Sequence, residues 1–198
     1  MICAIILAAG QSKRMGTAKL LLPFGDSTII QTIIDNVRQS KIDEVLVVVG
    51  ADREKIEGAV HHLHVATVFN PQHATGMLSS IQAGMAAVPP GAKATVVVLG
   101  DQPSLSPATI DRIIDAHANT NKGIVLPSYH RRRGHPILID MKYKEDIQNL
   151  NPDVGLRELI RNNPQDIHEV EVGTDSILQD IDYKEDYKKE KKKHDNSP

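Results

Sequence analysis

ICAIILAAGQSKRMGTAKLLLPFG, residues 2–25, begins as an uninterrupted apolar run and turns at Gly10 into a polar loop. The run has no alternation of apolar and polar residues, which predicts a strand buried on both faces of a sheet. The loop that follows holds two glycines and three cationic residues, Lys13, Arg14 and Lys19. Glycines let the backbone approach a ligand closely, so this loop predicts a local anion site at the end of the first strand.

The composition indicates that any anion site is local and is not part of a broad basic surface. With 198 residues and 40% hydrophobic content, the chain is long enough for one domain with a full core. A formal net charge of −2 provides no broad basic surface, so nucleic acid is not an expected partner. The one cysteine, Cys3, excludes an internal disulfide and fits a reducing compartment.

The apolar N-terminal run does not resemble a targeting signal. No basic residue precedes it, and a charged loop follows it directly. No other run approaches the roughly 18 apolar residues of a membrane span. These features predict a cytoplasmic protein without a membrane partner.

Strand and helix patterns alternate along the chain. Buried strands are predicted at 2–8, 44–50, 65–69, 94–100 and 123–127, with a further strand at 137–140. Helices are predicted around 29–37, 77–85, 106–118 and 155–162. This order predicts an α/β protein, a single-domain Rossmann-like three-layer sandwich with a mostly parallel sheet. In such sheets ligands bind at the carboxyl ends of the strands, so the loops after residues 8, 50, 69, 100 and 127 should converge on one site.

The composition changes again at the C-terminus. Residues 1–187 are predicted to form the domain, and 188–198 form a lysine-rich tail. The tail has few apolar residues, which predicts that it does not pack and is disordered.

The first loop matches neither of two familiar phosphate-binding motifs. The dinucleotide fingerprint needs a second glycine two residues after the first, and none follows Gly10 in that way. A Walker A loop needs lysine directly after its second glycine, whereas Lys19 stands three residues after Gly16.

The pattern that remains, L-A-A-G-x-S-x-R-M-G-x-x-K, resembles the signature loop of MobA-like nucleotidyltransferases, in particular the molybdenum cofactor cytidylyltransferase branch. The match continues through KLLLPFG to Gly25. The resemblance implies a nucleotide-diphospho-sugar transferase fold. It implies that Ala9, in an Ala-Ala-Gly start, selects CTP. It also implies nucleotide binding by Leu7, Ala8, Ala9, Gly10, Ser12, Arg14 and Lys19.

Two acidic segments are candidates for a divalent cation, which in proteins prefers carboxylate oxygens. Asp101 follows a buried strand, and GDQP is similar to the family's GD-x-P, which implies that this aspartate holds Mg²⁺ or Mn²⁺. QDIDYKEDY looks like a degenerate copy of the family's Asp-x-Asp-Thr-Pro-Glu-Asp element. That likeness implies Asp182 as the second ligand, with Asp180 as the alternative. The competing interpretation assigns 180–186 to the solvated tail.

Two further segments are candidates for the remaining substrate groups. NPQHATGMLSSI, residues 70–81, resembles the family segment that closes over the nucleotide, with Gly76, Ser79 and Ser80 as candidates, while His73 is expected at the surface or in a hydrogen bond. HRRRGHP suits an anionic acceptor because arginine binds phosphate well. The family's acceptor-side G-H-P implies Arg133, Gly134, His135 and Pro136. The alternative there is an exposed basic hairpin.

Together the residues and the resemblance predict transfer of CMP from CTP to the terminal phosphate of molybdopterin, with pyrophosphate released. Arg14, Lys19 and Asp101 are the predicted catalytic residues. Two alternatives stay open: a nucleotidyltransferase for a sugar or alditol phosphate, and a non-catalytic, cofactor-binding chaperone of a client molybdoenzyme.

Overall fold

The structure, a computed structural model, describes residues 1–196 and is built on one eight-stranded sheet. Its strands run in the order β10-β7-β9-β6-β1-β4-β5, and β8 pairs with β7. They are β1 (Ile2–Ala8), β4 (Glu44–Val49), β5 (Ala66–Phe69), β6 (Ala94–Leu99), β7 (Ile124–Tyr129), β8 (Arg132–Arg133), β9 (Ile137–Asp140) and β10 (Ile167–Glu171). A separate hairpin pairs β2 (Pro23–Phe24) with β3 (Ser27–Thr28).

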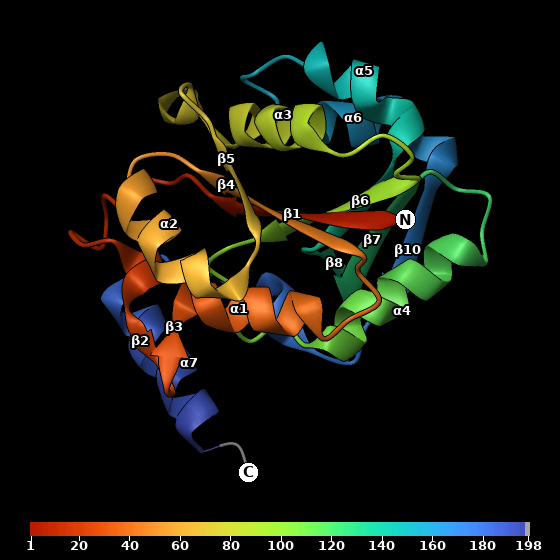
Figure 1. Ribbon diagram of the computed structural model, residues 1–198. Helices are drawn as coiled ribbons and strands as arrows, with labels where there is room; N and C mark the ends of the chain where they lie inside the picture. The colour runs from red at the N-terminus through yellow and green to blue at the C-terminus, as the bar shows by residue number, and fades with distance from the viewer. Residues whose placement is uncertain (197–198) are drawn as a thin grey trace.

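Helices cover both faces of the sheet, which confirms the predicted three-layer α/β fold (Figure 1). One layer contains α1 (Ile29–Arg38), α2 (Arg53–Val60) and α4 (Pro107–Ala118). The other contains α3 (Met77–Ala87), α5 (Lys144–Gln148) and α6 (Leu156–Asn162). The final helix, α7 (Lys184–Asp195), lies beside the β2–β3 hairpin.

Strand β1 is apolar throughout because each of its faces packs into a different core. Ala4 and Ile6 belong to the cluster that includes α1 and α4. Cys3 and Ile5 belong to the cluster that includes α3 and α5. A strand with a core on each side has no position for an alternating polar residue.

The direction in which the chain leaves β1 positions the site. Strand β1 pairs in parallel with β4 on one side and with β6 on the other. The strand order therefore reverses at β1, and ligands of open α/β sheets bind at the carboxyl ends of the strands beside such a point.

Local sequence explains why α1 starts where it does, directly after the hairpin. Thr28 accepts a hydrogen bond from the Gln31 backbone amide, and the Gln31 side chain bonds back to the Thr28 amide. This capping box satisfies two amides that the first turn leaves without helical partners. The apolar stripe predicted at 29–37 is fully buried.

Several elements differ from the sequence predictions. Strand β5 is an exposed edge strand and is not buried on both faces. Strand β9 runs antiparallel to both β6 and β7, and β10 was not predicted because its charged residues interrupt the apolar pattern. Most of the supposedly unpacked tail is helix α7, while residues 197–198 lie outside the described part. Within residues 1–196 no helix has the length and apolar character needed to cross a membrane.

Candidate active site

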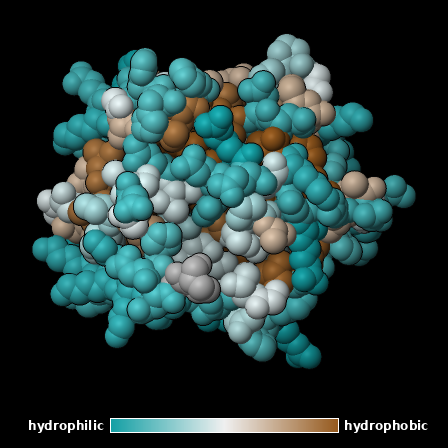
Figure 2. Space-filling view, turned by 60° about the horizontal axis from the view of Figure 1, so that its bottom comes forward, coloured by the Kyte–Doolittle hydropathy of each residue, from teal (hydrophilic) through white to brown (hydrophobic). Residues whose placement is uncertain are grey.

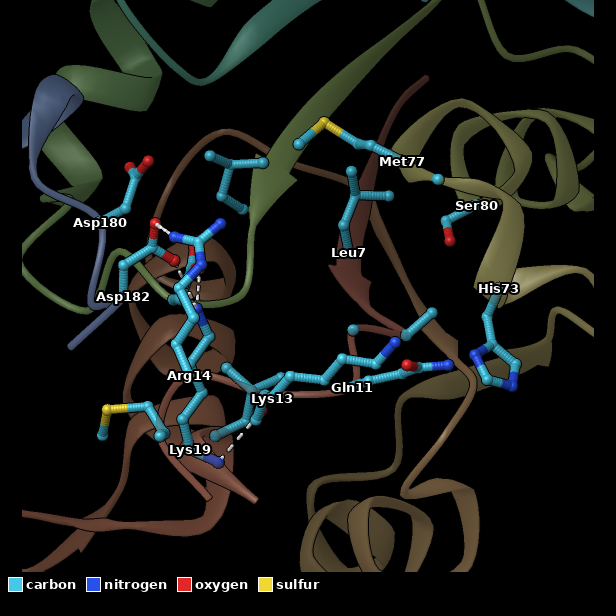
Figure 3. Close-up of a pocket in the computed structure, with 18 of the residues that line it drawn as sticks. Leu7, Gln11, Lys13, Arg14, Lys19, His73, Met77, Ser80, Asp180 and Asp182 are labelled. Atoms are coloured by element: carbon cyan, nitrogen blue, oxygen red, sulfur yellow. Dashed lines mark hydrogen bonds and ion pairs between the residues drawn. The ribbon is translucent and has the colours of Figure 1, made fainter. Parts of the chain in front are cut away.

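A pocket of about 540 Å³ opens at the carboxyl end of β1. Its walls come from the loop after β1, the short helix η1 (Lys19–Leu21) and the segment before α3. Asp101, which follows β6, and the 180–182 segment complete them. Figure 3 shows that Arg14 and Asp182 lie at one side of the pocket, and His73, Met77 and Ser80 at the other. Segments far apart in sequence thus meet at the predicted edge of the sheet.

Lys19 is the centre of the charged side of this pocket. Its Nζ donates to Asp101 Oδ2 at 2.5 Å, to the Ile181 carbonyl oxygen at 2.7 Å and to Asp182 Oδ1 at 3.3 Å. The Lys19 side chain is only 13% exposed, so solvent screens these interactions weakly. One ammonium group therefore holds both predicted metal ligands.

Arg14 reaches the same acidic segment from the loop. Its guanidinium donates a hydrogen bond to Asp182 and lies over the Tyr183 ring, 5.6 Å from the ring centroid. The hydrogen bond and charge of Asp182 raise the pKa of Arg14 above its usual value. Arg14 is more than half exposed, and its side chain is available to a ligand that enters the pocket.

The loop's own backbone positions these cations. Ser12 and Gly16 both have positive φ, at 47° and 68°, and the amides of Met15 and Gly16 donate to the Ser12 carbonyl oxygen. The Ser12 hydroxyl accepts from the Lys19 amide at 3.3 Å. The Met15 side chain is buried in the core and anchors the turn to it. The glycine in the motif meets a conformational need, since positive φ costs other residues free energy.

Burial shifts the pKa values of two groups of this region, Asp101 and His135. Desolvation raises the pKa of Asp101, although the Lys19 ammonium opposes the shift, and the Asp180 charge adds to it. Desolvation also lowers the pKa of His135 to about 4, against a smaller opposing effect of Asp101. At neutral pH His135 is therefore an uncharged imidazole within electrostatic range of Asp101.

Gln102 is a buried residue near the site that the sequence pattern did not indicate. Its amide donates to Asp180 Oδ1 at 2.6 Å and to the Ile177 carbonyl oxygen at 3.3 Å, and the residue is 1% exposed. The bond between the Ile181 amide and the Asp101 carbonyl oxygen, 3.1 Å long, ties the same two segments together. Gln102 follows Asp101 directly, but nothing in its local sequence signals a partner so far along the chain.

The opposite side of the pocket is built around Asn70. This buried amide donates to Ser79 Oγ at 2.9 Å and to Ser80 Oγ at 3.0 Å. Ser79 also donates to backbone carbonyl oxygens and does not line the pocket, whereas Gly76 and Ser80 do. Ser79 thus shapes the loop, and its hydroxyl is already used.

His73 also faces this side. It lines the pocket, and within the described structure its Nδ1 is buried without a hydrogen-bond partner.

Of the residues predicted for the nucleotide and the metal, all but Ala8 and Ser79 line the pocket. Ala8 instead packs into the core on the α1 side. The structure adds lining residues that were not predicted: Gln11, Lys13, Met15, Leu20, His73, Ala74, Met77 and Leu99. Two of them, Gln11 and Lys13, occupy variable positions of the loop motif, where the pattern carries no signal.

The four residues predicted for the acceptor lie outside the pocket wall. Arg133 is on β8, half exposed, and forms an ion pair with Glu169 of β10. Gly134 packs against the Ile177 backbone, and the His135 amide donates to the Ile177 carbonyl oxygen at 3.0 Å. Arg131, Arg132 and Arg133 are exposed where β8 pairs with β7, and the charge of Asp101 acts on the neighbouring His135.

The donor set fits a divalent cation of the magnesium type. Asp101 and Asp182 supply hard carboxylate oxygens that meet at Lys19, and Asp180 lies within electrostatic range of Asp101. Within residues 1–196 no group of three or more histidine, cysteine or acidic side chains forms a complete metal cage. Mg²⁺ commonly binds to one or two carboxylates and takes its other oxygens from phosphate and water, so a partial protein set is what it needs.

Comparison with known proteins supports a nucleotide-processing role. The MobA-like NTP transferase domain matches residues 4–169. Molybdenum cofactor cytidylyltransferase of Escherichia coli strain K12 is 32% identical over 184 residues, covering 92% of each chain. Nicotine blue oxidoreductase of Paenarthrobacter nicotinovorans is 28% identical over 190 residues, covering 91% of this chain and 92% of that one.

Solved structures of similar proteins have the same fold as this chain. Rv0371c from Mycobacterium tuberculosis H37Rv superposes with a TM-score of 0.84 at 29% identity, covering 96% of this chain and 97% of that one. Its complex with manganese gives a TM-score of 0.81 at 28% identity, over 96% and 98% of the two chains. The fold is that of the nucleotide-diphospho-sugar transferases. The chain belongs to the MobA-like NTP transferase family and is a nucleotidyltransferase of this type.

Proposed function

We propose that this protein transfers CMP from CTP to the terminal phosphate of a molybdopterin-type acceptor and releases pyrophosphate. The observation that carries the proposal is the meeting of Lys19 and Arg14 with Asp101 and Asp182 in one pocket. Polyanion-binding cations and metal-binding carboxylates at one sheet edge are what nucleotidyl transfer requires. The similarity to the E. coli cytidylyltransferase and the Ala-Ala-Gly start at Ala9 favour CTP.

In this account the chain's residues mainly bind and orient. Lys19 and Arg14 exchange their carboxylate partners for phosphate oxygens of the entering triphosphate. Asp101 and Asp182, with Asp180 as the alternative to Asp182, would hold Mg²⁺ or Mn²⁺. When bound, that cation neutralises phosphate charge and polarises the α-phosphate.

The reaction then needs no proton transfer to a protein base. A phosphate oxygen of the acceptor attacks the α-phosphorus of CTP, and the bond from that phosphorus to the β-phosphate oxygen breaks. A phosphate monoester is already an anion near neutral pH. Lys19 and Arg14 stabilise the charge that develops on pyrophosphate as it leaves.

The acceptor is proposed to enter from the side of the 133–136 segment. The electrostatic effect of Asp101 on His135 supports this side, because Asp101 belongs to the proposed metal site. Arg133 would exchange Glu169 for an acceptor phosphate. Ser80 and Gly76 line the side of the pocket left for the nucleoside.

The test is pyrophosphate release from CTP, GTP, ATP and UTP, with Mg²⁺ and molybdenum cofactor as acceptor. We expect release selective for CTP and at least about 100-fold slower in Asp101→Asn, because the variant removes a charge at the metal site. Circular dichroism of the variant controls for folding.

Other outcomes assign the protein elsewhere. Release that requires a sugar phosphate or an alditol phosphate would contradict the molybdopterin acceptor and retain nucleotidyl transfer. Cofactor binding by a folded chain that releases no pyrophosphate with any nucleotide or acceptor would support the chaperone alternative.

A further inference from the structure

Helix α7 links the acidic segment of the site to the hairpin that follows the basic loop. It begins two residues after Asp182 and lies beside β2 and β3 (Figure 1). The face turned forward in Figure 2 is largely hydrophilic, in keeping with the many lysines of this helix. Although the helix is rich in lysine, three contacts attach it to the domain.

The first contact fixes the start of the helix. Asp186 Oδ2 accepts from the Asp182 amide at 3.1 Å and from the Tyr183 amide at 2.8 Å. A carboxylate at a helix N-terminus is favoured by the helix dipole and by the unpaired amides there. The backbone that carries Asp182 and Tyr183 is therefore locked to the first turn of α7.

The second contact joins the helix to β2. The Tyr187 hydroxyl donates to the Pro23 carbonyl oxygen at 2.6 Å, and the His194 ring packs on Phe24 with 4.6 Å between centroids. Pro23 is four residues after Lys19, and Phe24 is buried in the core. The helix is thus bound to the segment that follows Lys19, the residue that bonds to Asp101 and Asp182.

The third contact joins the helix to the loop after β6. Glu190 is 2% exposed, accepts from Ser104 Oγ at 2.6 Å, and forms an ion pair with Lys193 at 2.9 Å. A buried carboxylate is costly unless its oxygens are paired, so Glu190 strongly favours one position of the helix. Ser104 is three residues after Asp101.

The three contacts form a closed frame around the charged site. Asp182 leads into α7, α7 binds the chain after Lys19 and the chain after Asp101, and those two residues bond to each other. Movement of α7 would shift Asp182 relative to Lys19 and Arg14.

We propose that Tyr187 is a positioning residue of the active site, which acts through α7 to hold Asp182 against Lys19 and Arg14. The hydroxyl is the part that matters, because the ring alone packs at the edge of the core. The positional part stands without an assigned reaction, and the metal part rests on the proposed function.

The test compares Tyr187→Phe with native protein and with Lys189→Ala, an exposed position on the same helix. Hydrogen exchange is followed by mass spectrometry in the full chain. Loss of one hydrogen bond should raise exchange about 3- to 10-fold at 180–186 and at 19–24, and leave β1, β4 and α3 unchanged. Lys189→Ala should match the native chain.

Affinity for Mn²⁺ alone, measured by electron paramagnetic resonance, gives the second readout. We expect Tyr187→Phe to bind Mn²⁺ at least about threefold more weakly, since Asp182 loses its fixed place. A purely structural role would raise exchange across the whole sheet and leave this affinity intact. Unchanged local exchange, uniformly faster exchange, or unchanged Mn²⁺ affinity in the variant would each overturn the proposal.

A native chain that binds no Mn²⁺ would contradict the metal assignment of the proposed function. The exchange pattern would then decide the positional role by itself.

Discussion

At the scale of single residues, Lys19 shows what the sequence could and could not predict. The motif identified it as a phosphate-binding cation, because a lysine after two glycines beside a buried strand is typical of such loops. Its bonds to Asp101 and Asp182 join residues 82 and 163 positions away, which no local pattern reveals. The resemblance supplied the aspartates, and the fold supplied their distance from the lysine.

Replacing Lys19 tests whether this ammonium stabilises phosphate charge. Lys19→Met keeps most of the side-chain length and removes the charge, which should slow pyrophosphate release about 100- to 1,000-fold. Lys13→Met is the matched control in the same loop and should cost less than about 10-fold. Equal effects of the two variants would contradict a distinct role for Lys19.

His135 gives the protein a pH dependence of known sign. Its folded pKa of about 4 lies below the usual 6.5, so the neutral imidazole contributes stability above pH 6.5 that is lost as pH falls toward 4. Denaturant unfolding at pH 7 and pH 5 measures this loss. His135→Gln should lose about 2 kcal/mol less than native protein between these two values. Equal losses would mean that His135 is protonated normally in the folded protein.

Among the secondary-structure elements, strands buried on both faces were predicted from the sequence, whereas elements at the edge of the fold were not. The apolar runs became β1, β4, β6 and β7 because burial on both faces leaves a continuous signal. Strand β10 lies at a sheet edge, and polar residues interrupt its apolar ones. Helix α7 packs through Tyr187, Glu190 and His194, which share one face at helical spacing. Two of the three are not apolar, so the hydrophobic pattern could not show them.

Two helical glycines test how closely α3 packs on the sheet. A methyl group at Gly84 would overlap the Ile5 side chain and lie 3.1 Å from Val48, whereas at Gly58 it would meet nothing within 4 Å. Gly84→Ala should lower the free energy of unfolding by about 1–3 kcal/mol, because overpacking outweighs the better helix propensity. Gly58→Ala should raise it by up to about 1 kcal/mol. Denaturant unfolding of both variants measures these changes. A higher free energy of unfolding in both would show that α3 has room to move away from the sheet.

At the scale of the whole molecule, the sheet brings segments from both ends of the chain to one edge. The loop after β1 meets residues 180–182, and the family match ends at residue 169, before that acidic segment. The architecture was predictable because strand and helix patterns alternate. The closed frame through α7 was not predictable, since it depends on contacts between one helix and two separate loops.

Ligand binding across this edge should stabilise the whole domain. CTP with Mg²⁺ at about 100 times its dissociation constant should add about 2.7 kcal/mol, or about 5–10 °C in melting temperature. Thermal unfolding with each nucleotide measures the shift. Lys19→Met should lose most of it, because the phosphates lose their buried cation. A full shift in that variant would place the triphosphate elsewhere on the protein.

The fate of isotopic label shows whether the nucleotidyl group itself is transferred. The protein is incubated with molybdenum cofactor, Mg²⁺ and CTP labelled at either the α- or the γ-phosphate. We expect α-label in the acceptor and γ-label in pyrophosphate, both abolished by Asp101→Asn. Label from the γ-phosphate in the acceptor, or α-label released only as free CMP, would contradict it.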